Sequence, residues 1–400
     1  ALQKNGYRTM WAGITDDVEL PLDKGLERGF DQIHTLVPQG PDWQNGYQKI
    51  LPELLDGKPT FLFLHTYAVH APYLAGPGPR RYMSLPDSTI PLSEDEFYAN
   101  SGPFYGWVLT QFLTRLAASD TPESKNRNQT ILNTLTRALS HNDLKAAQKV
   151  SWQFPSYEQY LFYNRWYWKL ANLQNPRTVP FVQSLYDERI NQLDDTLKPL
   201  LDFVSRPDVK RKTIVIFTSD HGEEFMEHGF MEHDSNLYKT STHVPFIAAI
   251  PHIESGVRDG LAQSIDIYPT LLQLVGIKPM GTLEGQSLVS ALTDTTGTKG
   301  DTYLVSEHRG SILRSIQDGT WKLYLHNPPD RQPWTELFNL LTDPNETYNS
   351  AGAHPAVVEK LSATLTTILK NSPKFEPIES EFPAWIDSQR RQHLIEHGYF

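Results

Sequence analysis

Cysteine is absent from the 400-residue sequence. Its absence excludes disulfide bonds, thiolate metal ligands and a thiol nucleophile. Positive charge is also scarce, since 36 lysine and arginine residues against 47 aspartate and glutamate residues give a net charge of −11. Binding to nucleic acid or to an anionic membrane surface relies on clustered positive charge, so we expect neither partner.

Long apolar runs are missing as well. No uninterrupted apolar stretch reaches the length of a membrane span. The first residues do not form a charged-then-apolar leader, so we expect no signal peptide within these residues. A chain of 400 residues exceeds one ordinary hydrophobic core, which predicts a large domain and a smaller one.

Residues 213–234 combine a strand-like run with several acidic residues and histidines that could bind a metal. The first six are β-branched or apolar, which is typical of a buried strand. Asp220 and His221 follow at the carboxyl end of that strand, where ligands of α/β sheets bind, and Gly222 permits a sharp turn. A hard divalent cation would favour the carboxylate, and zinc would accept either donor. The alternative interpretation is a solvated acidic turn.

Ser219-Asp220-His221-Gly222 resembles the metal-binding strand end of the sulfatase family, within the alkaline-phosphatase-like superfamily. A strand-like run that ends in His70-Ala-Pro-Tyr73 resembles another block of the family. Further blocks follow in the family's order, at residues 186–195, 237–246, 264–271, 285–288, 318–323 and 336–344. Their order makes a chance resemblance improbable.

The resemblance implies an α/β fold, with a mixed, mostly parallel central sheet flanked by helices and a smaller C-terminal subdomain of antiparallel sheet plus helix. It implies a sulfatase-like domain at 1–299 with a helical and aromatic insertion at about 104–178, a subdomain at 300–370 and a surface tail at 371–400. The sequence pattern predicts strands at 60–64, 213–218, 244–250, 303–307, 313–316 and 321–325, and helices at 51–55, 131–139, 183–205, 266–275 and 355–370.

Two features of the family are missing. No Cys/Ser-x-Pro-x-Arg motif, from which sulfatases make their formylglycine nucleophile, occurs in the sequence. Residues 1–9 and Gly29-Phe-Asp31 instead resemble the part that follows the nucleophile segment. We therefore expect that an N-terminal piece has been lost, has been cleaved off or lies on a separate fragment or chain, and that the isolated chain is inactive. Residues 11–15 also lack the family's Gly-Lys-x-His, which removes a cationic contact to the ester.

Four histidines are candidates for the site. By resemblance, His70 lies beside the bridging oxygen of the ester and acts as general acid, and the alternative is a loop histidine bonded to the backbone. His233 takes the place of a lysine that holds the anionic oxygens of the substrate. Strand alternation puts His65 opposite His70, so core packing and substrate binding both remain open for it. For His228, a structural role and substrate binding also remain open.

Residues 152–168 are dense in tryptophan, tyrosine and phenylalanine. They predict either a helix with an aromatic face on the core or a platform that stacks a sugar or aryl group, since aromatic faces suit sugar CH edges. Residues 74–103 are rich in proline and predict a loop at the mouth of the site.

The resemblance implies a metal-dependent sulfuric ester hydrolase that acts on a carbohydrate or aryl sulfate through a formylglycine. Ca²⁺ is the expected ion, with Zn²⁺ and Mn²⁺ as alternatives. Two other functions remain open: a phosphodiester or phosphonate hydrolase or phosphoryl-headgroup transferase of the same superfamily, and a non-catalytic carbohydrate-binding protein. We expect a periplasmic, secreted or lysosomal location.

Overall fold

The computed structural model describes residues 1–13, 29–37, 40–71, 73, 122–141, 143, 146, 176–233, 236–293, 303–308, 312–328 and 332–372. Contacts divide the chain into two compact units. The N-terminal unit is Arg8–Leu201, and the C-terminal unit combines Ala1–Tyr7 with Asp202–Phe400. The domain boundary predicted at 299/300 falls inside the C-terminal unit and stays a prediction.

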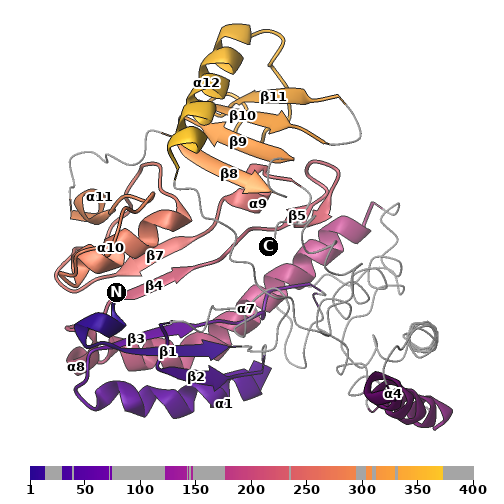
Figure 1. Ribbon diagram of the computed structural model, residues 1–400, viewed down its shortest axis with the longest axis vertical. Coiled ribbons are helices and arrows are strands. Elements are labelled where there is room, and N and C mark those ends of the chain that lie inside the picture. The colour runs from indigo at the N-terminus through magenta and orange to yellow at the C-terminus, as the bar shows by residue number, and fades with distance from the viewer. Residues whose placement is uncertain are drawn as a thin grey trace. The chain divides into compact units, whose positions relative to one another are not determined.

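Three parallel strands form the sheet of the N-terminal unit, in the order β2-β1-β3 (Figure 1). They are β1 (Arg8–Gly13), β2 (Gln32–Thr35) and β3 (Thr60–Leu64). Met10 and Ala12 are fully buried in the middle strand and Trp11 is 5% exposed, because a central parallel strand is covered on both faces. The predicted α/β class and parallel sheet are thereby confirmed, and β3 has the predicted bounds.

The helices of this unit are α1 (Gly40–Ile50), η3 (Leu51–Leu55), α4 (Pro122–Ser140) and α7 (Thr178–Ser205). Trp43 and Tyr47 lie four residues apart on one face of α1 and are buried. The indole of Trp43 donates to the carbonyl of His65 (2.9 Å) and the hydroxyl of Tyr47 to that of Thr196 (2.6 Å). Helix α1 therefore links the end of β3 to α7. The helix predicted at 51–55 is a 3₁₀ turn that continues α1.

The helix predicted at 183–205 is α7, which begins earlier. Phe181, Leu185 and Glu188 are buried, at the i, i+4, i+7 spacing of a helix face. Ile190 and Leu201 are each 45% exposed and lie off this face. Ile190 follows Leu185 by five residues, which turns it about 140° around the helix axis.

The C-terminal unit has short elements in its described part before residue 294. They are η1 (Gln3–Asn5), α8 (Pro207–Lys210), β4 (Val215–Thr218), β5 (Glu224–Phe225), β6 (Met231–Glu232), α9 (Lys239–Thr242), β7 (Phe246–Ala249), η4 (Ser264–Asp266), α10 (Ile267–Leu274) and α11 (Val289–Thr293). Strands β4 and β7 pair antiparallel, as do β5 and β6. The burial predicted for β4 is wrong, since Phe217 is 43% exposed and its cross-strand partner Ile247 is 63% exposed.

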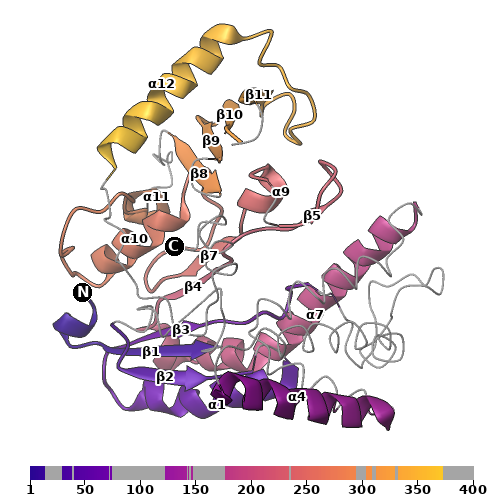
Figure 2. The same ribbon diagram turned by 45° about the vertical axis from the view of Figure 1, so that its right-hand side comes forward.

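Four antiparallel strands form the largest sheet described in this unit, in the order β11-β10-β9-β8. They are β8 (Leu304–His308), β9 (Leu313–Gln317), β10 (Trp321–His326) and β11 (Trp334–Asn339), followed by α12 (Pro355–Asn371). Figures 1 and 2 both show α12 along one face of the sheet. The predicted antiparallel sheet plus helix is confirmed.

Alternation along the strands gives this sheet two buried faces. Leu323 and Leu337 pack under α12 with Leu361. On the opposite face, Tyr324 and Phe338 pack against residues of the segment before β7, chiefly Leu237. The sheet therefore lies between α12 on one side and the 236–242 segment on the other.

Candidate functional site

Strand β4 ends at Thr218 and places Asp220 and His221 at its carboxyl end. The hydroxyl of Ser219 donates to the carbonyl of His221 (3.0 Å), and the amide of His221 donates to Oδ1 of Asp220 (3.0 Å). These bonds fix the turn while leaving the two functional side chains accessible, with 73% exposure for Asp220 and 38% for His221.

The ring of His221 is oriented by its own backbone. Its Nδ1 lies 2.9 Å from the carbonyl of Gly222, and because a carbonyl can only accept, Nδ1 carries the proton. Nε2 is then the nitrogen with the lone pair, and it lies 3.7 Å from Oδ2 of Asp220. Metal–ligand bonds of about 2.0–2.6 Å allow two ligands of one ion to lie at that separation. A backbone bond at the second ring nitrogen is also typical of metal-binding histidines.

Asp220 and His221 therefore fit as two donors to a divalent ion. Within the described residues, no group of three or more histidine, aspartate or glutamate side chains is placed to hold a metal. Since such ions take four or more ligands, this pair alone could supply only part of a coordination shell.

Gly222 is required for a reason other than the predicted one. Its φ is not positive, so the turn does not depend on glycine's access to the left-handed region. Instead, a Cβ atom at this position would lie 2.0 Å from the carbonyl oxygen of Thr240. The amide of Gly222 also donates to the carbonyl of Ser241 (2.8 Å). The strand end and helix α9 are thus in direct backbone contact.

His233 lies beside the candidate metal ligand. Its ring stacks on that of His221 with the centroids 3.9 Å apart, and its Nδ1 lies 3.0 Å from Oε1 of Glu223. The side chains of His233 and Glu223 are 8% and 6% exposed. The structure therefore brings His233 to the strand end, and its predicted contact with the substrate stays a prediction. Glu223 was missed, although its position directly after the motif is a signal that could have identified it.

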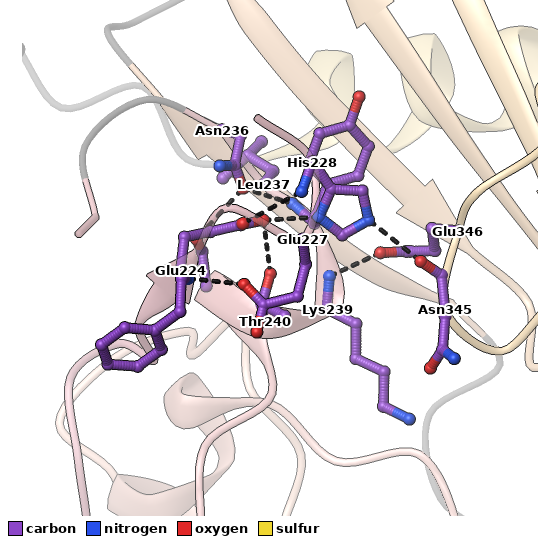
Figure 3. A network of polar contacts seen from close by, with 12 residues as sticks. Glu224, Glu227, His228, Asn236, Leu237, Lys239, Thr240, Asn345 and Glu346 are labelled. Carbon is purple, nitrogen blue, oxygen red and sulfur yellow. Dashed lines mark hydrogen bonds and ion pairs between the residues drawn. The ribbon is translucent and has the colours of Figure 1, made fainter. Parts of the chain in front are cut away.

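His228 lies in a different environment, shown in Figure 3. Its Nδ1 contacts the buried carboxylate of Glu224, its Nε2 lies 2.9 Å from the carbonyl of Asn345, and its ring stacks on Tyr238 at 3.9 Å. Both ring nitrogens therefore face oxygens of the protein. This geometry is that of a structural residue, and the substrate role of His228 stays a prediction.

His65 and His70 belong to the N-terminal unit. His65 follows β3, and its ring packs among Trp11, Phe63 and Tyr67. Strand alternation does not relate it to His70, because β3 ends at Leu64 and the chain then turns. Nδ1 of His70 lies 2.6 Å from the carbonyl of Ala71. The roles predicted for both stay predictions.

Some predicted features lie outside the described residues. These are the loop at 74–103, the aromatic stretch at 152–168 and the tail from 373. Among the helices that the structure describes, none is both long and apolar enough to cross a membrane.

Residues 1–277 match the sequence pattern described as sulfatase, and residues 226–372 match that described as N-sulphoglucosamine sulphohydrolase, C-terminal. Arylsulfatase K of Mus musculus is 28% identical over 234 residues, which cover 54% of this chain and 42% of that protein. Arylsulfatase K of Gallus gallus is 30% identical over 223 residues, covering 52% and 41%. The chain thus spans less than half the length of these relatives.

Solved structures share the fold. A protein in complex with its substrate D-glucosamine-2-N,6-O-disulfate has a TM-score of 0.56 at 17% identity, covering 93% of this chain and 82% of that chain. A 2-O GAG sulfatase has a TM-score of 0.52 at 21% identity, covering 92% and 73%. The sulfatase pattern extends over well more than half of the sequence, and the chain therefore belongs to the sulfatase family.

Proposed function

We propose that the chain is part of a metal-dependent sulfuric ester hydrolase that acts on a carbohydrate or aryl sulfate outside the cytoplasm. The observation that carries the proposal is the strand end at which an exposed Asp220 carboxylate lies beside the lone-pair nitrogen of His221. The relatives named arylsulfatase K and 2-O GAG sulfatase support a sulfate ester. The relative bound to a glucosamine disulfate supports a sugar.

Members of the sulfatase family typically bind a divalent metal. We propose that Asp220 and His221 hold it here, with Ca²⁺ as the first candidate and Zn²⁺ and Mn²⁺ as alternatives. When bound, such an ion neutralises the negative ester oxygens and activates an attacking hydroxyl. We place the nucleophile, a formylglycine, outside residues 1–400, since these contain no cysteine and no Ser-x-Pro-x-Arg motif.

His70 is the proposed general acid. Its Nδ1 faces the carbonyl of Ala71 and therefore carries a proton, so a ring that also donates from Nε2 must be the imidazolium. In that form it protonates the oxygen of the leaving alcohol as the ester bond breaks.

The charge around His233 bears on the type of ester. The carboxylate of Glu223 lies against its ring and offsets positive charge where we propose that the anionic oxygens of the ester substrate bind. A phosphate monoester carries nearly two negative charges and would be disfavoured more strongly than a singly charged sulfate ester. A phosphodiester is also singly charged, which makes phosphodiester hydrolysis the second candidate function.

A comparison of substrates tests the reaction type. The protein is expressed from its complete reading frame and assayed with an aryl sulfate, glucosamine sulfates, an aryl phosphate and a phosphodiester. We expect sulfate esters to be turned over fastest. Faster turnover of the phosphodiester than of every sulfate ester would overturn the sulfatase proposal, and absence of both turnover and bound metal would support a carbohydrate-binding role.

His70→Ala tests the general acid. General acid catalysis is typically worth ~10²–10⁴-fold, and an activated aryl leaving group needs little of it. We therefore expect a loss of that size in kcat for sugar sulfates and a much smaller loss for an activated aryl sulfate. Equal losses on both substrates would instead indicate that His70 positions the substrate.

A further inference from the structure

A buried polar cluster joins the C-terminal sheet to residues 236–242, which we call the support segment. The ammonium of Lys322 lies 3.0 Å from the Glu346 carboxylate and 2.9 Å from the carbonyl of Leu237. The side chains of Lys322 and Glu346 are 4% and 0% exposed. The hydroxyl of Tyr324 lies 2.9 Å from the same Leu237 carbonyl and 3.0 Å from Glu346. The second oxygen of Glu346 accepts from the amide of Lys239 (Figure 3).

The backbone of Glu346 is held in an unfavourable conformation. Its φ is 57°, in the left-handed region that is unfavourable for a residue with a side chain. Such a conformation persists only where the surroundings over-determine it. Here the turn is fixed from within, because the Asp343 carboxylate accepts the amides of Thr347 and Tyr348. The turn aims the Glu346 carboxylate into the sheet interior and onto the support segment.

The support segment in turn contacts the strand end. The carbonyl of Ser241 accepts the amide of Gly222, and the carbonyl of Thr240 occupies the space that a Cβ at Gly222 would need. The hydroxyl of Thr240 also donates to the buried carboxylate of Glu224 (2.7 Å). The support segment therefore fixes the position of the backbone at Gly222, directly after the candidate metal ligands.

We propose that Glu346, together with Lys322, is a positioning pair for the metal-binding strand end. It fixes the support segment, which fixes Gly222 and with it the directions of Asp220 and His221. The predicted effect on metal affinity rests on the proposed function. The contacts that run from the C-terminal sheet through the support segment to residues 219–226 do not depend on it. Neither residue of the pair touches substrate in this proposal.

The test separates positioning from stability. The double variant Lys322→Met/Glu346→Met removes both charges, and apolar replacement of a buried ion pair is often neutral or stabilising. The global stability should thus stay close to that of the parent, while the amide of Lys239 loses its acceptor and the carbonyl of Leu237 keeps only the hydroxyl of Tyr324. Hydrogen exchange followed by mass spectrometry should then show about tenfold or faster exchange in residues 219–226, with β9 and β10 unchanged.

Glu307→Gln is the matched control. Glu307 belongs to the same sheet and pairs with Arg314 at 3.3 Å, but its side chain is 36% exposed. We expect no change in residues 219–226 for this variant. If the double variant fails to fold, Tyr324→Phe carries the same test, since it removes one hydroxyl contact to Leu237 and leaves the ion pair in place.

Two outcomes would overturn the proposal: unchanged exchange at 219–226 in a folded double variant, or an equal increase in every peptide of the unit. A second readout is Ca²⁺ affinity by calorimetry on the same proteins, which should weaken in the double variant and not in Glu307→Gln. If Asp220→Ala leaves Ca²⁺ binding intact, the proposed metal site fails. The exchange result still decides the positioning role.

Discussion

Two pairs of neighbouring polar side chains in the C-terminal unit contrast in their surroundings. Lys322 and Glu346 are buried and every charged atom has a partner within the protein. Asp220 and His221 are 73% and 38% exposed, and their facing atoms, 3.7 Å apart, are beyond hydrogen-bonding distance. A buried charge must be satisfied by the fold itself, whereas a group that binds an external ligand keeps a lone pair accessible. The difference separates residues that hold the fold together from residues that we propose bind the metal.

The largest expected effect is the loss of stability when the buried pair of Lys322 and Glu346 is broken. Glu346→Gln leaves the ammonium of Lys322 buried beside a neutral amide, and removal of one partner from a buried ion pair typically costs about 3–5 kcal/mol. We expect a loss of that size in the free energy of unfolding, measured with urea. Glu307→Gln, in the exposed pair, should change it by less than about 0.5 kcal/mol. Equal losses in the two variants would remove the contrast.

The same variant has a pH signature. Burial lowers the pKa of Lys322, and the Glu346 carboxylate opposes that shift. Without the carboxylate, the pKa in the folded state falls further below its ordinary value of 10.5. Between the two values the unfolded chain binds more protons than the folded chain, so stability rises with pH. Glu346→Gln should therefore regain part of its lost stability as the pH approaches about 10.

An intermediate effect concerns the exposed pair. Asp220→Ala should weaken metal binding by more than the ~10–100-fold that loss of an outer-shell partner costs, because a direct ligand is removed. Its unfolding free energy without metal should stay within about 0.5 kcal/mol of the parent, since the carboxylate is largely solvated. Metal content by mass spectrometry and urea unfolding measure the two quantities. Unchanged metal content would refute the assignment of Asp220.

The smallest expected effect is that of Glu223, which is neither in the buried pair nor in the exposed pair. Glu223 orients the ring of His233 through one hydrogen bond. Glu223→Ala removes a charge-assisted bond worth about 1.5 kcal/mol, so KM for the sulfate ester should rise roughly tenfold with less change in kcat. Glu223→Gln keeps an acceptor and should restore most of the loss. A fall in kcat alone would place Glu223 elsewhere in the mechanism.

Local patterns in the sequence predicted the elements well. Strand β3 has its predicted bounds, and β8, β9 and β10 lie within two residues of theirs, because alternation and apolar runs are properties of neighbouring residues. The same patterns identified the strand end with Asp220 and His221. The burial of β4 was not predictable from its own residues, since burial depends on what covers a strand.

Contacts between segments that are far apart in the chain could not be predicted from the sequence. The requirement for glycine at 222 comes from the backbone of Thr240, which no local pattern reveals. Likewise, the sequence left both a structural role and substrate binding open for His228, and only the folded chain shows that its two ring nitrogens face Glu224 and Asn345. Pairing across such distances depends on the folded chain rather than on spacing in the sequence.

The turn at Glu346 also sets an order of events during synthesis. The carboxylate that holds the amide of Lys239 lies 107 positions later in the chain, and the ammonium that holds Leu237 lies 85 positions later. A ribosome that adds ~5–20 residues per second therefore needs several seconds to supply these contacts after the support segment has been made. Asp220 and His221 are thus synthesised before the residues that hold the support segment, and under the positioning proposal the strand end gains its final geometry only after Glu346 has been made.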